Sequence, residues 1–289
     1  MKKSTIICSL IGLALALHAQ DAKQPTAIRA TVGDVTDNRT TGTFNSECKI
    51  EVKFTGDAAA DATDVHEVRV TKAVDELGRD LVPKEKPDHF GGHMSNFHHR
   101  QNGLTAEVVL RNPSRSSSVI KLVEGEVEFF NPTASNGGIL IIKNILAHPA
   151  EAVQDATLKK YGVEVMYLTK ASYEAKKKQI QDEEKSGSGG AIGQAFGDLF
   201  KGMFGGMMSS DSKDSIKLYI KDTDKRVVDF EFQDANGKPL KSHGSWSMSE
   251  MHNQDLDAPP PADTQLLIHL ATPEATQTFP FKLENIPLP

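Results

Sequence analysis

The sequence contains very little cysteine, and this shortage limits how the protein can be stabilised. Its 289 residues include two cysteines, Cys8 and Cys48, and Cys8 lies in an N-terminal segment typical of a cleaved export signal. A chain processed there keeps one thiol and has no internal disulfide. We therefore expect burial of apolar side chains to hold the fold together, for which a chain of this length is sufficient.

Motifs of the common enzyme classes are also lacking. The chain has no G-x-S-x-G, H-E-x-x-H, G-x-x-x-x-G-K-S/T or C-x-x-C sequence. Carboxylate pairs such as Asp222 and Asp224 fall in predicted turns, where solvated surface is the simplest interpretation. We predict a protein that is not an enzyme; a hydrolase would need catalytic groups assembled from distant loops.

Long hydrophobic runs are absent beyond the N-terminus. The chain opens with MKKSTIICSLIGLALALHAQ, in which Lys2 and Lys3 precede an apolar run over 6–17 and Ala19 is a small residue suited to cleavage. That run is shorter than the roughly twenty residues that span a bilayer. The sequence predicts a signal peptide over 1–19, with an uncleaved anchor as the alternative, and export to the periplasm or the extracellular space.

Positive charge is not in excess. The chain has 33 lysines and arginines against 39 aspartates and glutamates, a formal net charge of −6, and loses two lysines with the signal peptide. An acidic surface is poorly suited to a nucleic-acid phosphate backbone, so we expect no nucleic-acid partner. We also expect no transmembrane segment in the mature chain, which leaves peripheral contact as the open form of membrane binding.

What the sequence does contain is a repeated alternation of apolar and polar residues. In CKIEVKF, Cys48, Ile50, Val52 and Phe54 alternate with charged residues, which predicts a strand with one buried face. Similar runs, rich in β-branched and aromatic residues, are AIRATV, HEVRVTKAV, LTAEVVL, GVEVMYL, SIKLYI and VVDFEF. The pattern predicts an all-β protein.

The two halves of the chain share short matches in the same order. VDELGRDL and FQDANGKPL both contain D-x-x-G-x-x-L, with Asp75 matching Asp234 at an offset of 159. The aspartate and the glycine favour a tight turn between strands. Leu110 matches Leu270 at an offset of 160, and KIEVKF matches SIKLYI. We interpret these matches as a duplicated module.

We therefore expect two tandem antiparallel β-sandwich domains of about seven strands each. The predicted boundaries are 22–148 for the first domain, 149–154 for a linker and 155–289 for the second domain. The second domain is expected to carry a partly helical or disordered insertion over 172–214, because the first half has no counterpart to that segment.

The expected arrangement resembles the immunoglobulin and fibronectin type III classes of sandwich, although the Cys…Trp…Cys pattern of true immunoglobulin domains is absent. The C-terminal run FPFKLENIPLP (279–289) resembles the last strand of uncharacterised exported bacterial proteins with tandem domains of this class. This resemblance covers mainly the C-terminal half. It implies a fold and no known activity.

Histidines are concentrated in DHFGGHMSNFHHR (88–100). They could form a three-histidine zinc or copper site, but two glycines between the first pair disfavour the helix that would align them. No carboxylate lies inside the cluster to orient the ligands, and Asp88 lies only at its edge. We favour a plain loop that needs no cofactor and keep zinc or copper binding as the alternative. The four candidate ligands are His89, His93, His98 and His99.

Glycine, phenylalanine and methionine dominate SGSGGAIGQAFGDLFKGMFGGMMSS (186–210). As a helix, this segment would have an apolar stripe, although glycine disfavours a helix in water. It is either a loop resting on the second domain or an adhesive element that binds a protein, another envelope component or a lipid surface. The candidate contact residues are Ile192, Phe196, Leu199, Phe200, Met203, Phe204 and Met207.

Together these features predict a non-catalytic secreted or periplasmic module that binds a protein or another envelope component through 186–210. The alternative is a metal- or carbohydrate-binding protein that uses the 88–100 loop or stacks a sugar on Trp246.

Overall fold

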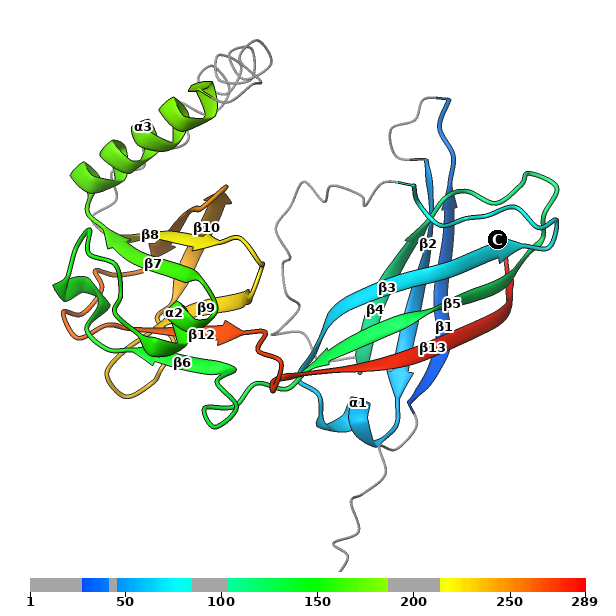
Figure 1. Ribbon diagram of the computed structural model, residues 1–289, viewed down its shortest axis with the longest axis horizontal. Coiled ribbons are helices and arrows are strands. Elements are labelled where there is room, and N and C mark those ends of the chain that lie inside the picture. Colours follow the sequence, from blue (N-terminus) through cyan, green and yellow to red (C-terminus); the bar gives the residue numbers. More distant parts are fainter. Residues whose placement is uncertain (1–27, 42–45, 85–102, 187–213) are drawn as a thin grey trace, which may run out of the picture.

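The computed structural model describes residues 28–41, 46–84, 103–186 and 214–289. Over these ranges the chain is mostly β, in four antiparallel sheets, which confirms the all-β class predicted from the alternation of apolar and polar residues. Figure 1 shows the strands gathered in two lobes.

Lobe 1 consists of two three-stranded sheets around a common core. Its sheets have the orders β1-β2-β4 and β3-β5-β13, and both contribute to one apolar cluster. The strand bounds are Arg29–Asn38 for β1, Glu47–Thr55 for β2, Asp64–Asp75 for β3, Leu104–Leu110 for β4, Val119–Phe130 for β5 and Thr276–Pro287 for β13, and the short helix α1 is Asp57–Asp61.

Lobe 2 consists of a four-stranded sheet, β10-β11-β8-β7, and a three-stranded sheet, β6-β12-β9. A second apolar cluster lies between them. The strand bounds are Ile139–Ile142 for β6, Val163–Leu168 for β7, Ser215–Asp222 for β8, Val227–Gln233 for β9, Ser242–Met248 for β10, Met251–Leu256 for β11 and Gln265–Leu270 for β12. The helices are η2 (Ile145–Ala147), α2 (Ala156–Lys160) and α3 (Lys170–Ser186).

The predicted alternation is visible in the core of lobe 1. Cys48, Ile50, Val52 and Phe54 of β2 are all buried. Burial, with the nearby charge of Asp37, raises the pKa of the Cys48 thiol to about 11, so the thiol stays protonated near neutral pH. Cys48 therefore serves as a small core residue, as the strand pattern predicts.

The last strand of lobe 1 comes from the C-terminus of the chain. β13 pairs with β5 from Thr276 opposite Phe130 to Pro287 opposite Val119. Strand pairing thus differs from the predicted division, which places 155–289 in a single domain. Alternation identifies a strand and its buried face, but not the sheet that receives it. The β13 residues in the core of lobe 1 are Phe279, Phe281, Leu283 and Ile286.

Residues 149–154, predicted as the linker between the domains, do not connect the lobes. They run beside β7 within lobe 2. The Ala150 N–H donates to the Tyr167 carbonyl (2.7 Å), and the Val153 N–H donates to the Val165 carbonyl (2.8 Å). Backbone groups committed in this way are part of a folded unit rather than of a free connection.

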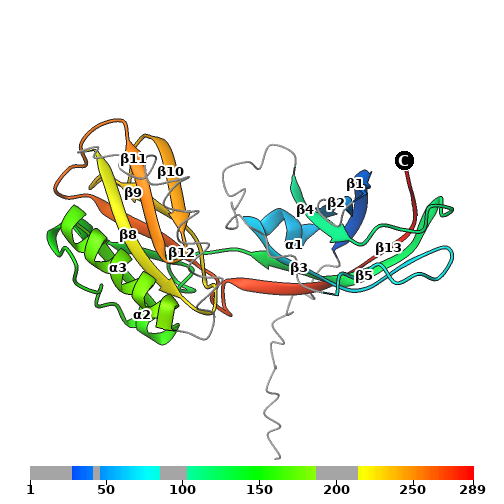
Figure 2. The ribbon, with the colours of Figure 1, turned by 90° about the horizontal axis from the view of Figure 1, so that it is seen from above.

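Two long segments run antiparallel through both lobes. Residues 119–142 form β5 and β6, and residues 265–287 form β12 and β13. β5 pairs with β13 in lobe 1, and β6 pairs with β12 in lobe 2. Figure 2 shows the two segments passing from one lobe to the other. We call this pair of segments the ribbon; lobe 2 is inserted between the last two strands of lobe 1.

The ribbon crosses between the lobes at 131–138 and 271–275, which we call the joint. The Asn131 N–H donates to the Ala275 carbonyl (2.8 Å), and the Leu270 N–H donates to the Gly138 carbonyl (2.9 Å). The lobes are therefore connected by hydrogen-bonded chain on both sides of the crossing.

Gly138 allows the two sides of the joint to approach closely. A Cβ atom there would lie 2.7 Å from the Pro132 Cα and 2.9 Å from the Ala275 Cβ, which leaves no room for any other residue. Thr272 and Ala275 on the opposite side are buried. The joint is thus a packed element rather than a flexible linker.

The two lobes have the same strand order. β1-β2-β4 corresponds to β7-β8-β11, and β3-β5 corresponds to β9-β12. β10 has no counterpart among the described strands of lobe 1. The remaining position, beside β5 or β12, is filled by β13 in lobe 1 and by β6 in lobe 2. Each lobe therefore receives its last strand from the opposite half of the chain.

The shared D-x-x-G-x-x-L motif forms the same turn in both lobes. The Asp75 N–H donates to the Arg79 carbonyl (3.1 Å), and the Asp234 N–H donates to the Lys238 carbonyl (2.9 Å). Each aspartate Oδ1 also accepts hydrogen bonds from the N–H groups two and four residues ahead. The motif glycines have φ angles of 82° and 79°, which glycine adopts without strain.

The other two sequence matches have different outcomes. KIEVKF and SIKLYI lie in β2 and β8, which occupy equivalent positions. Leu110 ends β4 and Leu270 ends β12, and these strands belong to different positions in the two lobes. The offset of 160 therefore joins residues that are not structurally equivalent.

We expect Asp75→Asn to destabilise the protein more than Asp234→Asn. Asp75 is fully buried, and its Oδ2 accepts the Ser114 N–H (2.9 Å), so an amide nitrogen placed there would face a donor. The free energy of unfolding, measured by urea denaturation, should fall by about 1–3 kcal/mol. Asp234→Asn keeps both turn hydrogen bonds on one oxygen and should cost below about 0.5 kcal/mol; equal losses would contradict this account.

We expect His252 to make the stability of lobe 2 depend on pH. Its ring lies 5.3 Å from that of Phe230, edge-on, and burial lowers its pKa from 6.5. The unfolded chain therefore binds the proton more readily, so the free energy of unfolding should fall as the pH drops below about 6.5.

His252→Gln should remove part of this fall, measured by urea denaturation between about pH 7.5 and about pH 5.5. His243 is exposed on β10, so His243→Gln is the matched control and should retain the full dependence. An unchanged slope for His252→Gln would show that this residue is not a source of acid sensitivity.

Candidate functional site

Two of the predicted sites lie outside the residues that the structure describes, and both remain predictions. Within the described ranges, no group of three or more His, Cys, Asp or Glu side chains is arranged to hold a metal ion. Trp246 is described and lies in β10. The residues outside the described ranges are His89, His93, His98 and His99, and Ile192, Phe196, Leu199, Phe200, Met203, Phe204 and Met207.

A third apolar cluster lies on the outer face of the four-stranded sheet of lobe 2. In β8, Leu218 and Ile220 point to the core of the lobe, whereas Tyr219 points to the opposite face. A sheet that is apolar on both faces needs a cover on each side. We call this group the outer cluster; its buried members are Leu168, Tyr173, Tyr219 and Met251, and its partly buried members are Met166, Ile180 and Trp246.

α3 supplies part of that cover. It follows directly after β7, and the Ser172 N–H at its start donates to the Thr169 Oγ1 (3.3 Å), which satisfies one free donor of the first turn. Tyr173 and Ile180, seven residues apart on one helix face, both join the outer cluster. A narrow apolar stripe therefore attaches α3 to lobe 2.

Aromatic contacts fix the base of α3. The Tyr173 ring meets the Trp246 ring edge-on, with centroids 6.3 Å apart and an interplanar angle of 81°. The Lys176 Nζ lies 4.1 Å from the Tyr219 ring centroid, a contact worth about 0.5–2 kcal/mol. From this base α3 extends beyond the sheets of lobe 2 (Figure 1). No helix in the described ranges is long and apolar enough to cross a membrane.

Two polar atoms under α3 lack hydrogen-bond partners among the described residues. They are the Tyr173 Oη and the Asn253 Oδ1, both buried. Burial raises the pKa of Tyr173 to about 12. Asn253 uses its Nδ2 to donate to the Asp255 Oδ1 (3.0 Å), so only its oxygen is left. Each such atom costs about 1–3 kcal/mol unless water or another group meets it.

Trp246 is the predicted carbohydrate-stacking residue, and its surroundings are well defined. It is half-buried, pairs with Asn253 across the β10–β11 ladder and contacts Tyr173 of α3. These contacts make it part of the packing between α3 and the sheet.

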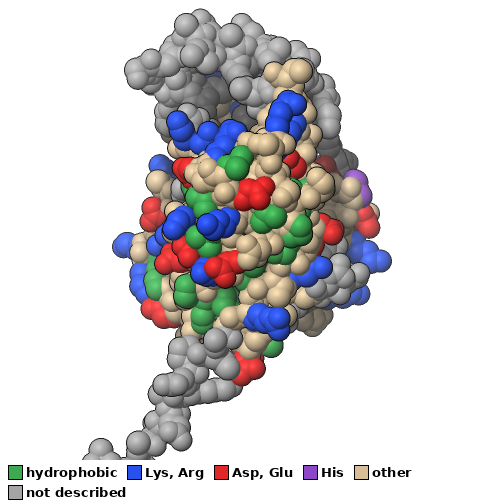
Figure 3. All heavy atoms as spheres, turned by 90° about the vertical axis from the view of Figure 1, so that its right-hand side faces the viewer, with side chains coloured by type: hydrophobic (Ala, Val, Ile, Leu, Met, Phe, Trp, Pro, Cys, Tyr) green, Lys and Arg blue, Asp and Glu red, His purple; other side chains and the backbone are tan. Residues whose placement is uncertain are grey.

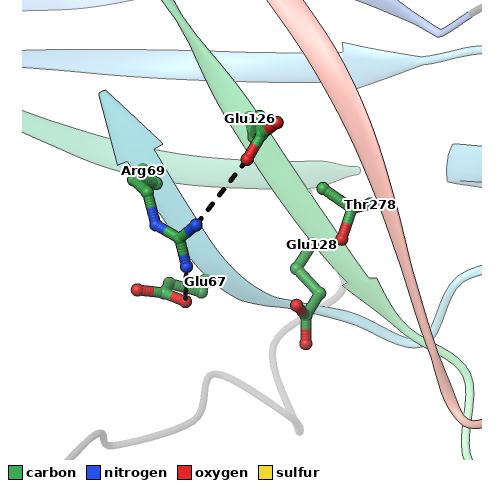
Figure 4. Close-up of a pocket in the computed structure, with 5 residues that line it drawn as sticks. All are labelled: Glu67, Arg69, Glu126, Glu128 and Thr278. Carbon is green, nitrogen blue, oxygen red and sulfur yellow. Dashed lines mark hydrogen bonds and ion pairs between the residues drawn. The ribbon is translucent and has the colours of Figure 1, made fainter. Parts of the chain in front are cut away.

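A different surface feature lies on the outer face of the β3-β5-β13 sheet. It is a shallow depression of about 70 Å³ lined by charged and polar side chains. Figure 4 shows Arg69 between two carboxylates; its guanidinium nitrogens lie 3.3 Å from Glu67 and 3.7 Å from Glu126. Glu128 and Thr278 complete the lining. The sequence signal for this face is the alternation of Glu124, Glu126 and Glu128 along β5, a pattern that by itself indicates no more than a polar strand face.

The groups in this depression are solvated rather than activated. The Arg69 side chain is 60% exposed, so its ion pairs contribute little to stability. Figure 3 shows lysines and arginines interspersed with aspartates and glutamates at the outer end of lobe 1, an arrangement that produces no strong field of one sign. α3 with the outer cluster is therefore the better candidate for a functional surface.

We expect the Tyr173 ring, rather than its hydroxyl, to anchor α3. Tyr173→Phe removes a buried hydroxyl without a described partner and should leave the free energy of unfolding unchanged or slightly higher. Tyr173→Ala should lower it by about 3–5 kcal/mol, because the outer cluster loses a large buried ring. Urea denaturation measures both variants. A large loss for Tyr173→Phe would show that the hydroxyl has an essential partner.

Comparison with known proteins yielded no match: no family model, no curated protein and no solved structure is similar to this chain. The resemblance of the C-terminal run 279–289 to exported bacterial proteins therefore stays a prediction.

Proposed function

We propose that this protein is a non-catalytic module, exported to the periplasm or the extracellular space, that binds a protein or another component of the cell envelope. We also propose that both lobes belong to the immunoglobulin and fibronectin type III class. Strand order supports this assignment, since β7-β8-β11-β10 and β9-β12-β6 follow the ABED and CFG order of an immunoglobulin constant domain. In that scheme the G position is filled by β6 in lobe 2 and by β13 in lobe 1.

The proposed contact surface is the insertion 172–214, which α3 begins. The observation that carries this proposal is the attachment of α3 to lobe 2 through the buried Tyr173 ring and the Lys176–Tyr219 contact. α3 therefore fixes the point on the molecule at which the apolar segment begins. Its binding therefore costs less conformational entropy than the binding of a free tail.

The composition of the insertion indicates the chemistry of the partner. Phenylalanine and methionine separated by glycine suit an adaptable apolar groove. The end of α3 contains the acidic run 182–184 directly before the apolar segment. Negative charge at that point is unfavourable next to an anionic lipid surface. Protein segments that bind such surfaces are rich in lysine and arginine. We therefore favour a protein partner over a membrane.

A second candidate function is the binding of a metal or a carbohydrate through the 88–100 loop or Trp246. The observation in its favour is that Trp246 lies, half-buried, on the edge strand β10. A thermal-shift screen with zinc, copper and oligosaccharides separates the two candidates, because only the second requires stabilisation by one of these ligands.

We expect serine substitution of the apolar contact residues to abolish partner binding in the full chain. The variant replaces Ile192, Phe196, Leu199, Phe200, Met203, Phe204 and Met207 together. Site-specific photocrosslinking in the envelope fraction of the producing cell should yield adducts with the unmodified chain and lose most of them, about tenfold or more, with the variant. Co-sedimentation with liposomes tests the membrane alternative in parallel.

The matched control replaces Gln194, Asp198 and Lys201 of the same segment with serine. It changes polar positions only and should retain the adducts. If the apolar variant and the control give the same adducts, the insertion is not the contact surface; if only liposome binding is lost, the partner is a lipid surface.

A further inference from the structure

β13 closes lobe 1 as an edge strand. Among the described strands of its sheet it pairs only with β5, in the order β13-β5-β3. It can therefore leave or enter the sheet without breaking any other of these strand pairs. Its departure would expose the edge of β5 and the apolar groove that its inward side chains fill.

The groove beside β5 is specific for a strand like β13. Both β5 and β13 are 12 residues long, and β13 inserts Phe279, Phe281 and Leu283 into the core. β6, which follows β5 directly in the chain, has only 4 residues. β6 is too short to pair with the full length of β5. It therefore cannot replace β13 in a β5–β6 hairpin.

Side-chain hydrogen bonds order the turn at 131–138 and connect it to the chain segment that leads into β13. The Asn136 Oδ1 accepts the N–H groups of Thr133 (2.9 Å) and Gly138 (3.0 Å), and its Nδ2 donates to the Asn131 carbonyl (2.9 Å). On the other side, the Thr272 Oγ1 donates to the Asn136 carbonyl (2.9 Å). Asn136 therefore closes one turn of the crossing and, through its carbonyl, ties it to the other.

We propose that the joint is a latch, and that opening it allows β13 to pair with β5 of a second copy of this chain. The β5–β13 pairing makes the same contacts in the monomer and in a strand-exchanged dimer, so it does not favour either state. That choice rests on the joint, which exists in its packed form only when both segments belong to one chain, and on protein concentration. The occupant of the groove is thus β13, from the same copy or from another.

Disulfide cross-linking between two chains that carry different cysteine substitutions tests this proposal. Glu124 and Lys282 lie opposite each other in the β5–β13 ladder, at a separation that a disulfide bridges. One full chain carries Glu124→Cys and the other carries Lys282→Cys, with Cys8→Ser in both, while Cys48 is buried and inert. A disulfide between the two chains forms under mild oxidation only when β13 pairs in trans.

Asn136→Ala, introduced into both chains, should raise the rate of interchain disulfide formation about tenfold, with a dimer visible by light scattering. Asn112→Ala is the matched control, because Asn112 also makes two side-chain hydrogen bonds, to Asp37 and Asn38, but lies away from the joint. It should behave like the parent chains. Thr272→Val, which removes the bond to the Asn136 carbonyl, replaces Asn136→Ala if that variant does not fold.

Three results would overturn the proposal. The first is the absence of interchain disulfide in every pair although circular dichroism shows folded chains. The second is an equal rate for the joint variant and for Asn112→Ala, which would mean that the joint is not the latch. The third is a dimer that persists when both cysteines are placed in one Asn136→Ala chain and oxidised within it, since that chain cannot release β13.

Discussion

The antiparallel ribbon is the constraint on which the rest of the molecule depends. Residues 119–142 and 265–287 pair in both lobes, and their crossing is packed around Gly138. The core of lobe 1 includes apolar side chains of β13. The core of lobe 2 is packed against by apolar side chains of β6. Neither core is complete without chain from the far side of the joint, so the lobes are parts of one folding unit rather than independent beads.

A second consequence concerns the four-stranded sheet of lobe 2, which is apolar on both faces. One face forms the core of the lobe, and the other needs a cover that α3 begins. α3 has few apolar residues and would be marginal alone; its attachment depends on Tyr173, Ile180 and Lys176. Because that sheet is tied to the ribbon through β6 and β12, the stem of the proposed contact segment has a fixed position relative to both lobes.

Local patterns predicted local structure well. The alternation around Cys48 identified β2 and its buried face, and D-x-x-G-x-x-L identified two turns with matching hydrogen bonds. The match of Leu110 with Leu270 was wrong as an equivalence, because short apolar runs look alike in any strand. Of the surface features, the charged face around Arg69 was visible only as polar positions, whereas the aromatic contact between Tyr173 and Trp246 joins residues too distant in sequence for any pattern to connect.

The sequence by itself determined that this is a mostly β chain, where the two D-x-x-G-x-x-L turns lie, and which side of β2 is buried, since these properties follow from steric and solvation preferences over a few residues. Only the tertiary structure decided that β13 completes lobe 1 and β6 completes lobe 2. Strand partners are selected by the fit of whole apolar faces and by strand length, and those are properties of two segments brought together rather than of either one alone.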